Sequence, residues 1–478
     1  MGNFSDELSG IMRIRKIAVD DIIQSMNISR AAFFKYKNGS RLPAKAEIVE
    51  EIADALRLNY NERSSLLESY QIDSIGEYKY RGMQAVERFL TTPVGEYSIK
   101  EFDFAAPAPD KMANLSVVHG KMHVLLRIYT TLCEGLNDGD VTIFETVCDK
   151  DVFPLLQQVR EANKTNSIEH IMAMNGSDDI HVADRLYGIE SLGSLLVTMC
   201  QCENYYPFYY YASLSTLRTF KEFMINSVVT KNCVFCYSGD MDSGVLYRDE
   251  GLCSYYRDVV ARWRKRAKPF AEKMDLATSL RSFLSFRDSS DEKYEFIPGI
   301  CMASIYEESD NLINTNLVIE DGAANQQMYD LVNYTAEFKK RLNTGKECNH
   351  FIVPGNALRF NLNTGTVQEL PRKVTIPLGR DTMYKMLRRF QQVCDTYDFR
   401  IIEDDRFPED NSFNVEVTQS QAMITVILPG ETMIRMFLVK EISAVSLIYE
   451  YLKHLYDNEA IRGRERSEWY EELFAGEY

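Results

Sequence analysis

The sequence has no run that approaches the roughly 18 consecutive apolar residues that a membrane-spanning helix needs. Its first ten residues, MGNFSDELSG, lack the charged and apolar segments of a secretory signal peptide. The 10 cysteines are scattered over 478 residues instead of being crowded into a short chain, so we expect reduced thiols. These absences predict a cytoplasmic protein that has no membrane partner.

The signatures of common catalytic sites are also missing. There is no G-x-S-x-G, no P-loop and no H-E-x-x-H motif. His119 and Lys121 form an H-x-K, but the downstream residue Leu126 is apolar where a phosphodiesterase of that motif needs Asp. The chain has only 6 histidines, so few catalytic sites that depend on histidine are open to it. We therefore expect no enzyme activity, no catalytic residue and no cofactor.

Two cysteine pairs and one acidic loop resemble metal sites only in part. Cys200-Gln201-Cys202 and Cys233-Val234-Phe235-Cys236 could offer four thiolates to zinc, but the second pair lies in an apolar strand pattern, where residues three apart point to opposite faces. Buried structural cysteines are the preferred interpretation. The loop from Asp240 to Gly244 begins like a calcium loop, but its glycine comes one residue early and Gly251 replaces the final Glu. A hairpin turn without a metal is predicted there.

Negative charge dominates the chain but not its N-terminal part. The formal net charge is -16, whereas residues 1–72 carry about as many cations as anions. No Asp or Glu occurs between Asp21 and Glu47. The cations of that interval are Arg30, Lys35, Lys37, Arg41 and Lys45. An acidic bulk is repelled by DNA, so only this basic segment is a candidate to bind it.

The segment from Ile17 to Lys45 has the pattern of two short helices joined by a tight turn. Asp20 and Asp21 stand where a helix N-terminus favours negative charge, and apolar residues follow at helical spacing up to Met26. Asn27 tolerates the left-handed conformation that a sharp turn between helices needs. The pattern predicts a helix-turn-helix.

The second helix of this pair has signals at both ends. Ser29 is a good N-cap, Gly39 occupies the position of a C-cap, and Pro43 prevents continuation. Phe33 and Tyr36 are three residues apart and are expected to face the core. The outward face then consists of Arg30, Ala31, Phe34, Lys35 and Asn38. A basic helical face of this kind suits the major groove of B-form DNA, which is about 12 Å wide.

These residues resemble the DNA-binding domain of the Cro and phage-repressor family, often called XRE-type, over roughly residues 5–72. Residues 29–43 follow the family's recognition helix, its glycine and its downstream proline. The resemblance implies a bacterial transcriptional regulator with base contacts from Arg30, Ala31, Phe34 and Lys35. It implies phosphate contacts from Lys37, Asn38, Ser40 and Arg41, and we expect Lys45 to add a further one.

The segment departs from the family at three positions. Val19 stands where the family usually has a Gln that touches the DNA backbone, Ile23 replaces a small Ala, and Asn27 replaces the turn Gly. An alternative also stays open, in which the helices serve dimerisation or partner binding and the charges only solvate a surface. DNA binding is favoured over it because solvated faces normally mix both signs of charge.

The rest of the chain divides by composition and periodicity. We predict a lambda-repressor-like helical domain over residues 1–72, in which Ser5 caps the first helix, and a connector with three prolines over residues 73–116. A large α/β portion follows, as lobes 117–290 and 291–478. Its predicted helices include residues 117–136, 152–162, 182–199, 252–268, 326–342, 442–456 and 464–473. Its predicted strands include 227–239 as one strand, segments from residues 141, 167, 244, 296, 316, 348, 373 and 399, and a hairpin over residues 415–430.

Two further expectations concern these lobes. The aromatic segment from Tyr205 to Ser213 favours a strand, and Pro207 favours an edge position or a strand start. The two lobes have similar composition, which leaves an internal duplication open, but no periodic match supports one.

The function predicted is a sequence-specific regulator that binds double-stranded DNA as a homodimer, with an acidic portion that dimerises or senses an unknown small molecule or peptide. The alternatives are a DNA-tethered enzyme and a protein-interaction module without DNA binding.

Overall fold

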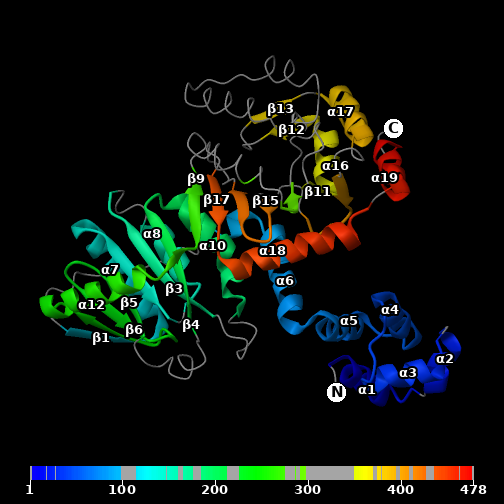
Figure 1. Cartoon of the computed structure of the whole chain (residues 1–478), viewed down its shortest axis with the longest axis horizontal. Helices are drawn as coiled ribbons and strands as arrows, with labels where there is room; N and C mark the ends of the chain where they lie inside the picture. Colours follow the sequence, from blue (N-terminus) through cyan, green and yellow to red (C-terminus); the bar gives the residue numbers. More distant parts are fainter. Residues whose placement is uncertain are drawn as a thin grey trace. The chain divides into compact units, whose positions relative to one another are not determined.

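The chain forms two compact units, Met1–Gln84 and Ala85–Tyr478. The first is helical and the second combines helices with β-sheets, which confirms the predicted order of a helical part followed by an α/β part (Figure 1). The computed structural model describes residues 3–17, 19–26, 28–97, 115–146, 148–159, 165–175, 185–212, 225–274, 286, 291–297, 349–369, 374–377, 379–393, 399–407, 413–426, 435–461 and 463–475. The predicted turn residue Asn27, the strand from residue 316 and the helix 326–342 lie outside these residues.

The first unit is built around one apolar core. Its helices are α1 (Asn3–Arg15), α2 (Val19–Ser25), α3 (Arg30–Lys37), α4 (Ala46–Ala55), α5 (Tyr60–Ile75) and the first part of α6 (Glu77–Thr91). Phe33 is fully buried in this core and Tyr36 is nearly so, as predicted. Helices α1 to α5 each contribute apolar residues to it, which is how short helices acquire stability that they lack in isolation.

The ends of these helices are capped by specific hydrogen bonds. The Ser29 hydroxyl accepts a hydrogen bond from the Ala32 N–H (3.2 Å), and Gly39 has a φ of 70°, so the predicted ends of α3 are confirmed. The prediction that Ser5 caps α1 is wrong, since Ser5 lies buried inside this helix. Asp73 of α5 instead accepts hydrogen bonds from the N–H groups of Asn3 (3.0 Å) and Phe4 (2.9 Å). A carboxylate distant in sequence thus satisfies first-turn donors.

The division between the units falls inside a continuous helix. Residues 84 and 85 both belong to α6, which lies within the connector expected over residues 73–116. The second half of this helix is part of the second unit, because Phe89 is buried there with its ring centroid 4.5 Å from that of Phe413. The short helix η1 (Val94–Tyr97) follows and packs against α10.

The first sheet of the second unit has the strand order β1-β7-β6-β5-β2-β3-β4-β8. Its strands are β1 (Leu115–His119), β2 (Val141–Glu145), β3 (Ile168–Asn175), β4 (Tyr205–Ala212), β5 (Asn226–Val229), β6 (Val234–Tyr237), β7 (Ser243–Tyr247) and β8 (Lys268–Pro269). β2, β3 and β4 are parallel, and the other pairings are antiparallel. The predicted partly parallel sheet is confirmed.

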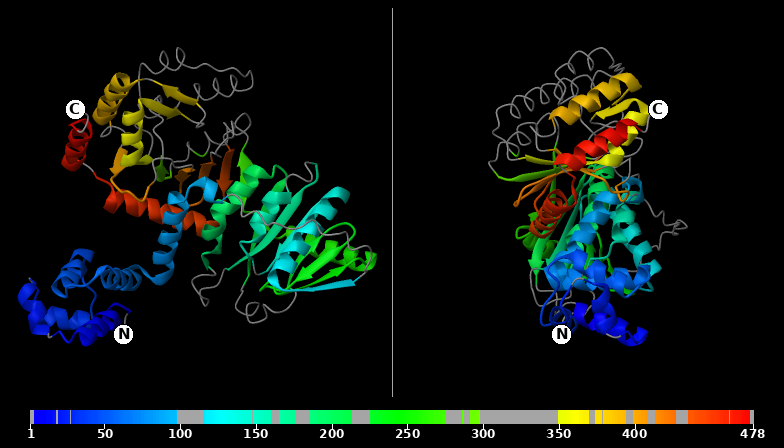
Figure 2. Two further views of the ribbon diagram at one scale, coloured as in Figure 1. Left: turned by 180° about the vertical axis from the view of Figure 1, so that it is seen from behind. Right: turned by 90° about the vertical axis from the view of Figure 1, so that its right-hand side faces the viewer.

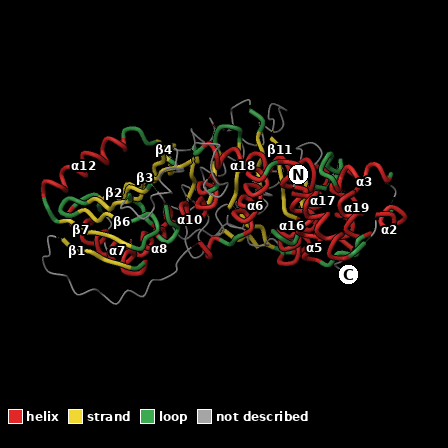
Figure 3. Tube along the Cα trace, turned by 90° about the horizontal axis from the view of Figure 1, so that it is seen from below, coloured by secondary structure: helices red, strands yellow, loops and turns green. Residues whose placement is uncertain are grey.

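Helices cover both faces of this sheet. They are α7 (Lys121–Asp138), α8 (Val152–Val159), α10 (Tyr187–Gln201) and α12 (Glu250–Arg264). Figure 3 shows α12 on one side of the strands and α7 and α8 on the other. The prediction of one helix over residues 117–136 is wrong at its start, because residues 115–119 form β1 and Gly120, at φ 88°, turns the chain into α7. Pairing of the β-branched residues Val117 and Val118 with β7 overrides the helical pattern.

The aromatic segment forms strand β4, as predicted. It is not the outermost strand, because the short β8 pairs with Phe208 and Tyr209 on its free side. The expected edge position is therefore wrong, although Pro207 lies near the start of the strand. Tyr205 and Tyr209 are buried, so this cluster builds the core of the sheet.

The second sheet has the order β14-β11-β10-β15-β16-β17-β9. Its strands are β9 (Ala271–Met274), β10 (Lys293–Phe296), β11 (Asn349–Pro354), β14 (Phe399–Ile402), β15 (Phe413–Val417), β16 (Ala422–Val426) and β17 (Arg435–Val439). The associated elements are α16 (Gly355–Thr364), α17 (Arg380–Val393), α18 (Ile442–His454), the π-helical turn Leu455–Glu459, α19 (Gly463–Ala475), and the hairpin of β12 (Thr366–Glu369) and β13 (Val374–Pro377). α16, α17, β9 and β17 had no predicted counterpart. Figure 2 shows the cyan and green strands of the first sheet and the orange strands of the second.

The two sheets repeat one topology. Taken in chain order, β1 to β7 correspond to β9, β10, β11, β14, β15, β16 and β17. Both sheets place these strands in the same spatial order, with the same two parallel and four antiparallel pairings. The internal duplication that the sequence left open is thus present as a structural repeat.

Local details of the repeat agree as well. The turns after β5 and β15 both begin with a threonine, Thr230 or Thr418, whose N–H donates to the carbonyl three residues on at 3.0 Å. Two residues separate β7 from α12 and β17 from α18, and the second of them, Asp249 or Glu441, caps the helix through its carboxylate. Equivalent positions in the two lobes can therefore be paired residue by residue.

The chain passes from one sheet to the other at a single residue, Phe270, between β8 and β9. The predicted lobe boundary at residues 290 and 291 is therefore too late in the chain. The sheets are joined by hydrogen bonds from the Tyr209 hydroxyl to the Lys440 carbonyl (3.2 Å) and from the Tyr211 hydroxyl to the Glu441 carboxylate (2.5 Å). These contacts join the two lobes within one compact unit.

Lys273 makes a further contact of this kind, and its protonation is expected to affect stability. Its ammonium donates to the carbonyl oxygens of Cys202 (2.9 Å) and Glu203. Burial, together with the nearby Arg435, lowers the pKa of Lys273 to about 8. An unfolded lysine has a pKa of about 10.4, so between these values the unfolded chain binds more protons and the free energy of unfolding rises with pH.

We expect the Lys273→Met variant to lose this contribution. Chemical unfolding of both proteins, from about pH 8 to about pH 10.5, should show a smaller rise, or a steeper fall, in the free energy of unfolding of the variant. Comparison with wild type removes the effect of tyrosines that titrate in the same range. Identical pH profiles would show that Lys273 does not have a lowered pKa.

Candidate functional site

The outward face of α3 is the candidate nucleic-acid interface. The four residues expected to contact bases, Arg30, Ala31, Phe34 and Lys35, are all exposed, and so is Asn38 at the end of the helix. The buried side chains of Phe33 and Tyr36 hold the opposite face of this helix in the core of the first unit. The predicted orientation of α3 is therefore confirmed.

The residues expected to contact phosphates cluster around the end of α3. Ser40, Arg41 and Lys45 are exposed, and Lys37 is partly buried. The Ser40 hydroxyl donates a hydrogen bond to the carbonyl of Lys35 (3.2 Å), and the N–H of Ser40 donates to the same oxygen (3.0 Å). Ser40 therefore closes the helix end in the free protein, and would have to redirect its hydroxyl to reach a phosphate.

The departures at Val19 and Ile23 are accommodated by packing. Both side chains are partly buried against the core of the first unit. The larger Ile23 thus adds to the contact between the helices, and Val19 presents no polar group at the position where the family has a Gln.

Arg30 has two partners that the sequence did not reveal. Its guanidinium lies 3.1 Å from the carboxylate of Asp20 on α2, and its Cζ is 5.8 Å from the ring centroid of Phe34. Both members of the ion pair are well exposed, so the pair contributes little to stability. The charge of Asp20 still lies beside the cation expected to meet DNA, where it opposes the approach of phosphates.

The Asp20→Asn variant is expected to bind DNA more tightly. Removing this carboxylate frees Arg30 and lowers the repulsion of phosphates, so we expect affinity to rise by about two- to five-fold for all duplexes alike. Glu51→Gln, an exposed position on α4 with the same change of charge, is the matched control. Fluorescence anisotropy with labelled duplexes measures both. A lower affinity of Asp20→Asn would show instead that Asp20 positions Arg30 for binding.

The first sheet contains a buried polar cluster that sequence reasoning missed. The Glu145 carboxylate accepts a hydrogen bond from the Tyr237 hydroxyl (2.8 Å) and lies 2.8 Å from Nε2 of His170. Nδ1 of His170 is 2.9 Å from the Tyr205 hydroxyl. Burial, with the nearby Glu145, raises the pKa of both tyrosines well above the usual value. Since Glu145 and His170 have no exposed surface, the cluster acts within the core.

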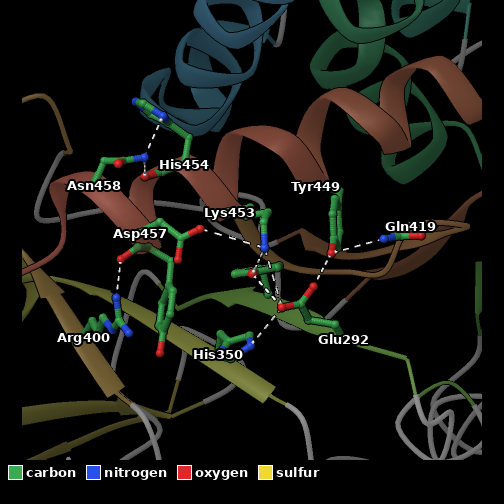
Figure 4. A network of polar contacts seen from close by, with 11 residues as sticks. Glu292, His350, Arg400, Gln419, Tyr449, Lys453, His454, Asp457 and Asn458 are labelled. Carbon is green, nitrogen blue, oxygen red and sulfur yellow. Dashed lines mark hydrogen bonds and ion pairs between the residues drawn. The ribbon is translucent and has the colours of Figure 1, made fainter. Parts of the chain in front are cut away.

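A second polar cluster joins α18 to the second sheet (Figure 4). The Glu292 carboxylate accepts hydrogen bonds from the hydroxyls of Tyr449 (2.5 Å) and Tyr294 (3.0 Å), and it lies 3.4 Å from Nε2 of His350 and 3.7 Å from Nζ of Lys453. The hydrogen bond from Tyr449 is the main reason that the pKa of Glu292 is lowered. Tyr449 and Lys453 belong to α18, whereas Tyr294 lies on β10 and His350 on β11. The cluster therefore holds α18 against these two strands.

The cysteine pairs and the acidic loop have structural roles. The Cys202 thiol donates to the Leu156 carbonyl (3.1 Å), and Cys200, Cys233 and Cys236 are also buried thiols. Residues 238–242 form the turn between β6 and β7, so the predicted hairpin turn is confirmed. The described residues contain no group of three or more His, Cys, Asp or Glu side chains that could hold a metal ion.

The H-x-K residues are also engaged within the chain. Nζ of Lys121 lies 3.0 Å from Asp149 and 2.7 Å from Asp151, and Nδ1 of His119 lies 3.4 Å from the hydroxyl of Ser243. No helix in the described part of the chain is long and apolar enough to cross a membrane.

No protein-family model and no curated protein matches this sequence. Among solved structures, an archaeal chromatin protein, TrmBL2, described as showing a novel mode of DNA binding, is 10% identical with a TM-score of 0.24, over 44% of this chain and 70% of that one. A phosphatidylserine synthase from Haemophilus influenzae Rd KW20 is 9% identical with a TM-score of 0.23, over 83% of this chain and 97% of that one. At these TM-scores neither likeness identifies a fold or a function.

Proposed function

We propose that this chain is a DNA-binding transcriptional regulator of the Cro and phage-repressor type, which reads the major groove with α3. One observation carries the proposal: a capped helix, held in the core by Phe33 and Tyr36, presents an exposed basic face. No acidic residue occurs in the sequence between Asp21 and Glu47, although the whole chain has a net charge of -16. Such a face offers cations to phosphates and side chains to base edges.

The length of α3 has a consequence for assembly. Eight residues of helix span about 12 Å, which covers only a few base pairs. Specific binding by one such helix is weak, so the regulator acts as a dimer on two half-sites about 34 Å apart, or a multiple of that distance. The acidic second unit supplies the dimer contact, a binding site for a small-molecule or peptide effector, or both.

Selection of duplexes from a random library by the full-length protein tests this proposal. The expected result is an enriched inverted repeat whose half-sites are centred about 10 to 11 base pairs, or a multiple of this, apart. Footprinting should then show protection of both half-sites on the same face of the duplex. A library without enrichment after repeated rounds would contradict sequence reading and leave the helices a packing or partner module.

A further inference from the structure

Phe34 is an exposed aromatic residue at the centre of the basic face. Its side chain is 37% exposed and lies outside the apolar core of the first unit, whereas the neighbouring aromatics Phe33 and Tyr36 are buried there. Ala31, three residues earlier on the same face of α3, is exposed too. These two side chains form a small apolar patch between the cations Arg30 and Lys35.

Neither Phe34 nor Ala31 belongs to the apolar core that the described residues of the first unit form. A cationic face that only attracted phosphates would gain nothing from a phenylalanine, since a ring offers neither a charge nor a hydrogen bond to a phosphate. Arg30 contacts the Phe34 ring at 5.8 Å, but it is also paired with Asp20, so the ring is not needed to hold it. The apolar surface of Phe34 is therefore available to a binding partner.

The partner of α3 under the proposed function has one kind of apolar group in its major groove. The base edges there present hydrogen-bond donors and acceptors, and the exception is the 5-methyl group on the pyrimidine of a thymine base pair. A cytosine methylated at C5 carries the same group in the same position. Arg, Lys and Asn side chains read the polar edges, whereas alanine methyls and phenylalanine rings contact this methyl group.

We infer that Phe34, assisted by Ala31, is a specificity-determining residue that reads a pyrimidine 5-methyl group in each half-site. This inference rests on the proposed function, and it names one chemical feature of the operator. Thymine supplies the methyl group in unmodified DNA, and 5-methylcytosine supplies it at methylated sites.

The test compares duplexes that differ only in this methyl group. The full-length protein is titrated with its selected duplex and with copies in which thymines are replaced one at a time, in both half-sites, by deoxyuridine, which keeps base pairing and lacks the methyl group. At one thymine position per half-site we expect affinity to fall by about four-fold per methyl group lost. A third duplex, with a 5-methylcytosine·guanine pair at that position, is compared with its unmethylated counterpart.

Variants of Phe34 connect the effect to its side chain. Phe34→Ala should lose most of the preference for the thymine duplex over the deoxyuridine duplex, and Phe34→Leu should recover part of it. Tyr60→Ala, which removes an aromatic ring that is 83% exposed at the start of α5, should keep the full preference. A greater gain from 5-methylcytosine than from thymine would identify methylated DNA as the source of the group.

Two results overturn the inference in distinguishable ways. If wild type binds a selected duplex but tolerates deoxyuridine at every position, or if Phe34→Ala keeps the preference, DNA reading stands and the role of Phe34 fails. If no duplex is enriched or bound above the level of random DNA, the proposed function fails with it.

Discussion

The Arg30→Ala/Lys35→Ala variant is expected to lose about 30-fold or more in affinity for the selected duplex. Arg30 and Lys35 are exposed on the same face of α3, and each base contact from such a residue contributes about 1 to 3 kcal/mol. Removing both also removes two cations from a surface that has no nearby acid other than those of α2. The combined loss is thus expected to reach about 2 to 6 kcal/mol, if the two contacts are independent.

A matched variant separates this effect from a general loss of charge. Arg13→Ala/Arg81→Ala removes two cations from exposed helical positions of the first unit outside α3. We expect it to lower affinity by less than about five-fold, for selected and random duplexes alike. Equal losses in the two double variants would show that α3 has no special role.

Single variants distinguish base contacts from phosphate contacts. Arg30→Ala should relax the preference at one base position, whereas Lys37→Ala should weaken binding to all sequences to a similar extent. The measurement is fluorescence anisotropy on duplexes with each base pair of one half-site changed in turn. A uniform loss in both variants would refute this division of roles.

The Glu145→Ala variant is expected to destabilise the second unit by about 3 to 5 kcal/mol. It leaves the His170 ring and the Tyr237 hydroxyl without their acceptor in a part of the core that has no exposed surface. The only two tryptophans of the chain, Trp263 and Trp469, both belong to the second unit. Chemical unfolding followed by their fluorescence therefore reports this unit alone.

The structural repeat provides the control for this variant. The last residues of β5 and β15, just before the threonine turns, pair with Thr142 and Tyr294, so these two positions are equivalent. Their partners on the neighbouring parallel strands, Glu169 and His350, are equivalent for the same reason. By the same count, Glu145 and His170 correspond to the apolar residues Ile297 and Phe351 of the second lobe.

The fold thus accepts apolar residues at both positions. The double variant Glu145→Ile/His170→Phe is expected to be more stable than Glu145→Ala, because no unpaired polar group remains at the pair itself. Two outcomes would contradict a paired role for these side chains. One is a loss of less than about 1 kcal/mol in the free energy of unfolding of Glu145→Ala; the other is a double variant that is destabilised by more than the sum of the losses in Glu145→Ile and His170→Phe.

The sequence predicted those features that depend on neighbouring residues. Ser29, Gly39 and the three-residue spacing of Phe33 and Tyr36 lie within one helix and its ends, so they correctly indicated where α3 begins, where it ends and which face it buries. Contacts between distant residues left no such signal. The cap supplied by Asp73 to α1 joins residues 70 positions apart, and local pattern instead favoured Ser5.

The same limit applies to the pairing of strands. The antiparallel partner of β1 is β7, far along the chain, and its helical neighbour α7 has an apolar periodicity that extended the predicted helix over β1. The duplication was not detectable because equivalent positions carry different residues, such as Glu145 and Ile297, while strand order and turn geometry are retained. Likewise, the sequence placed Asp20 at a helix start but gave no sign of its pairing with Arg30 on the next helix.

The most direct test of DNA reading by α3 is the affinity of the full-length protein for its selected duplex and for a random duplex, measured by fluorescence anisotropy across a series of salt concentrations. A dimer that places Lys37, Arg41 and Lys45 of each copy on phosphates should show a slope of log K against log salt near about -5. At each salt concentration it should prefer the selected duplex by about 1,000-fold or more, and Arg30→Ala/Lys35→Ala should abolish most of this preference. Equal binding to the two duplexes, with the same salt dependence in wild type and variant, would contradict the account.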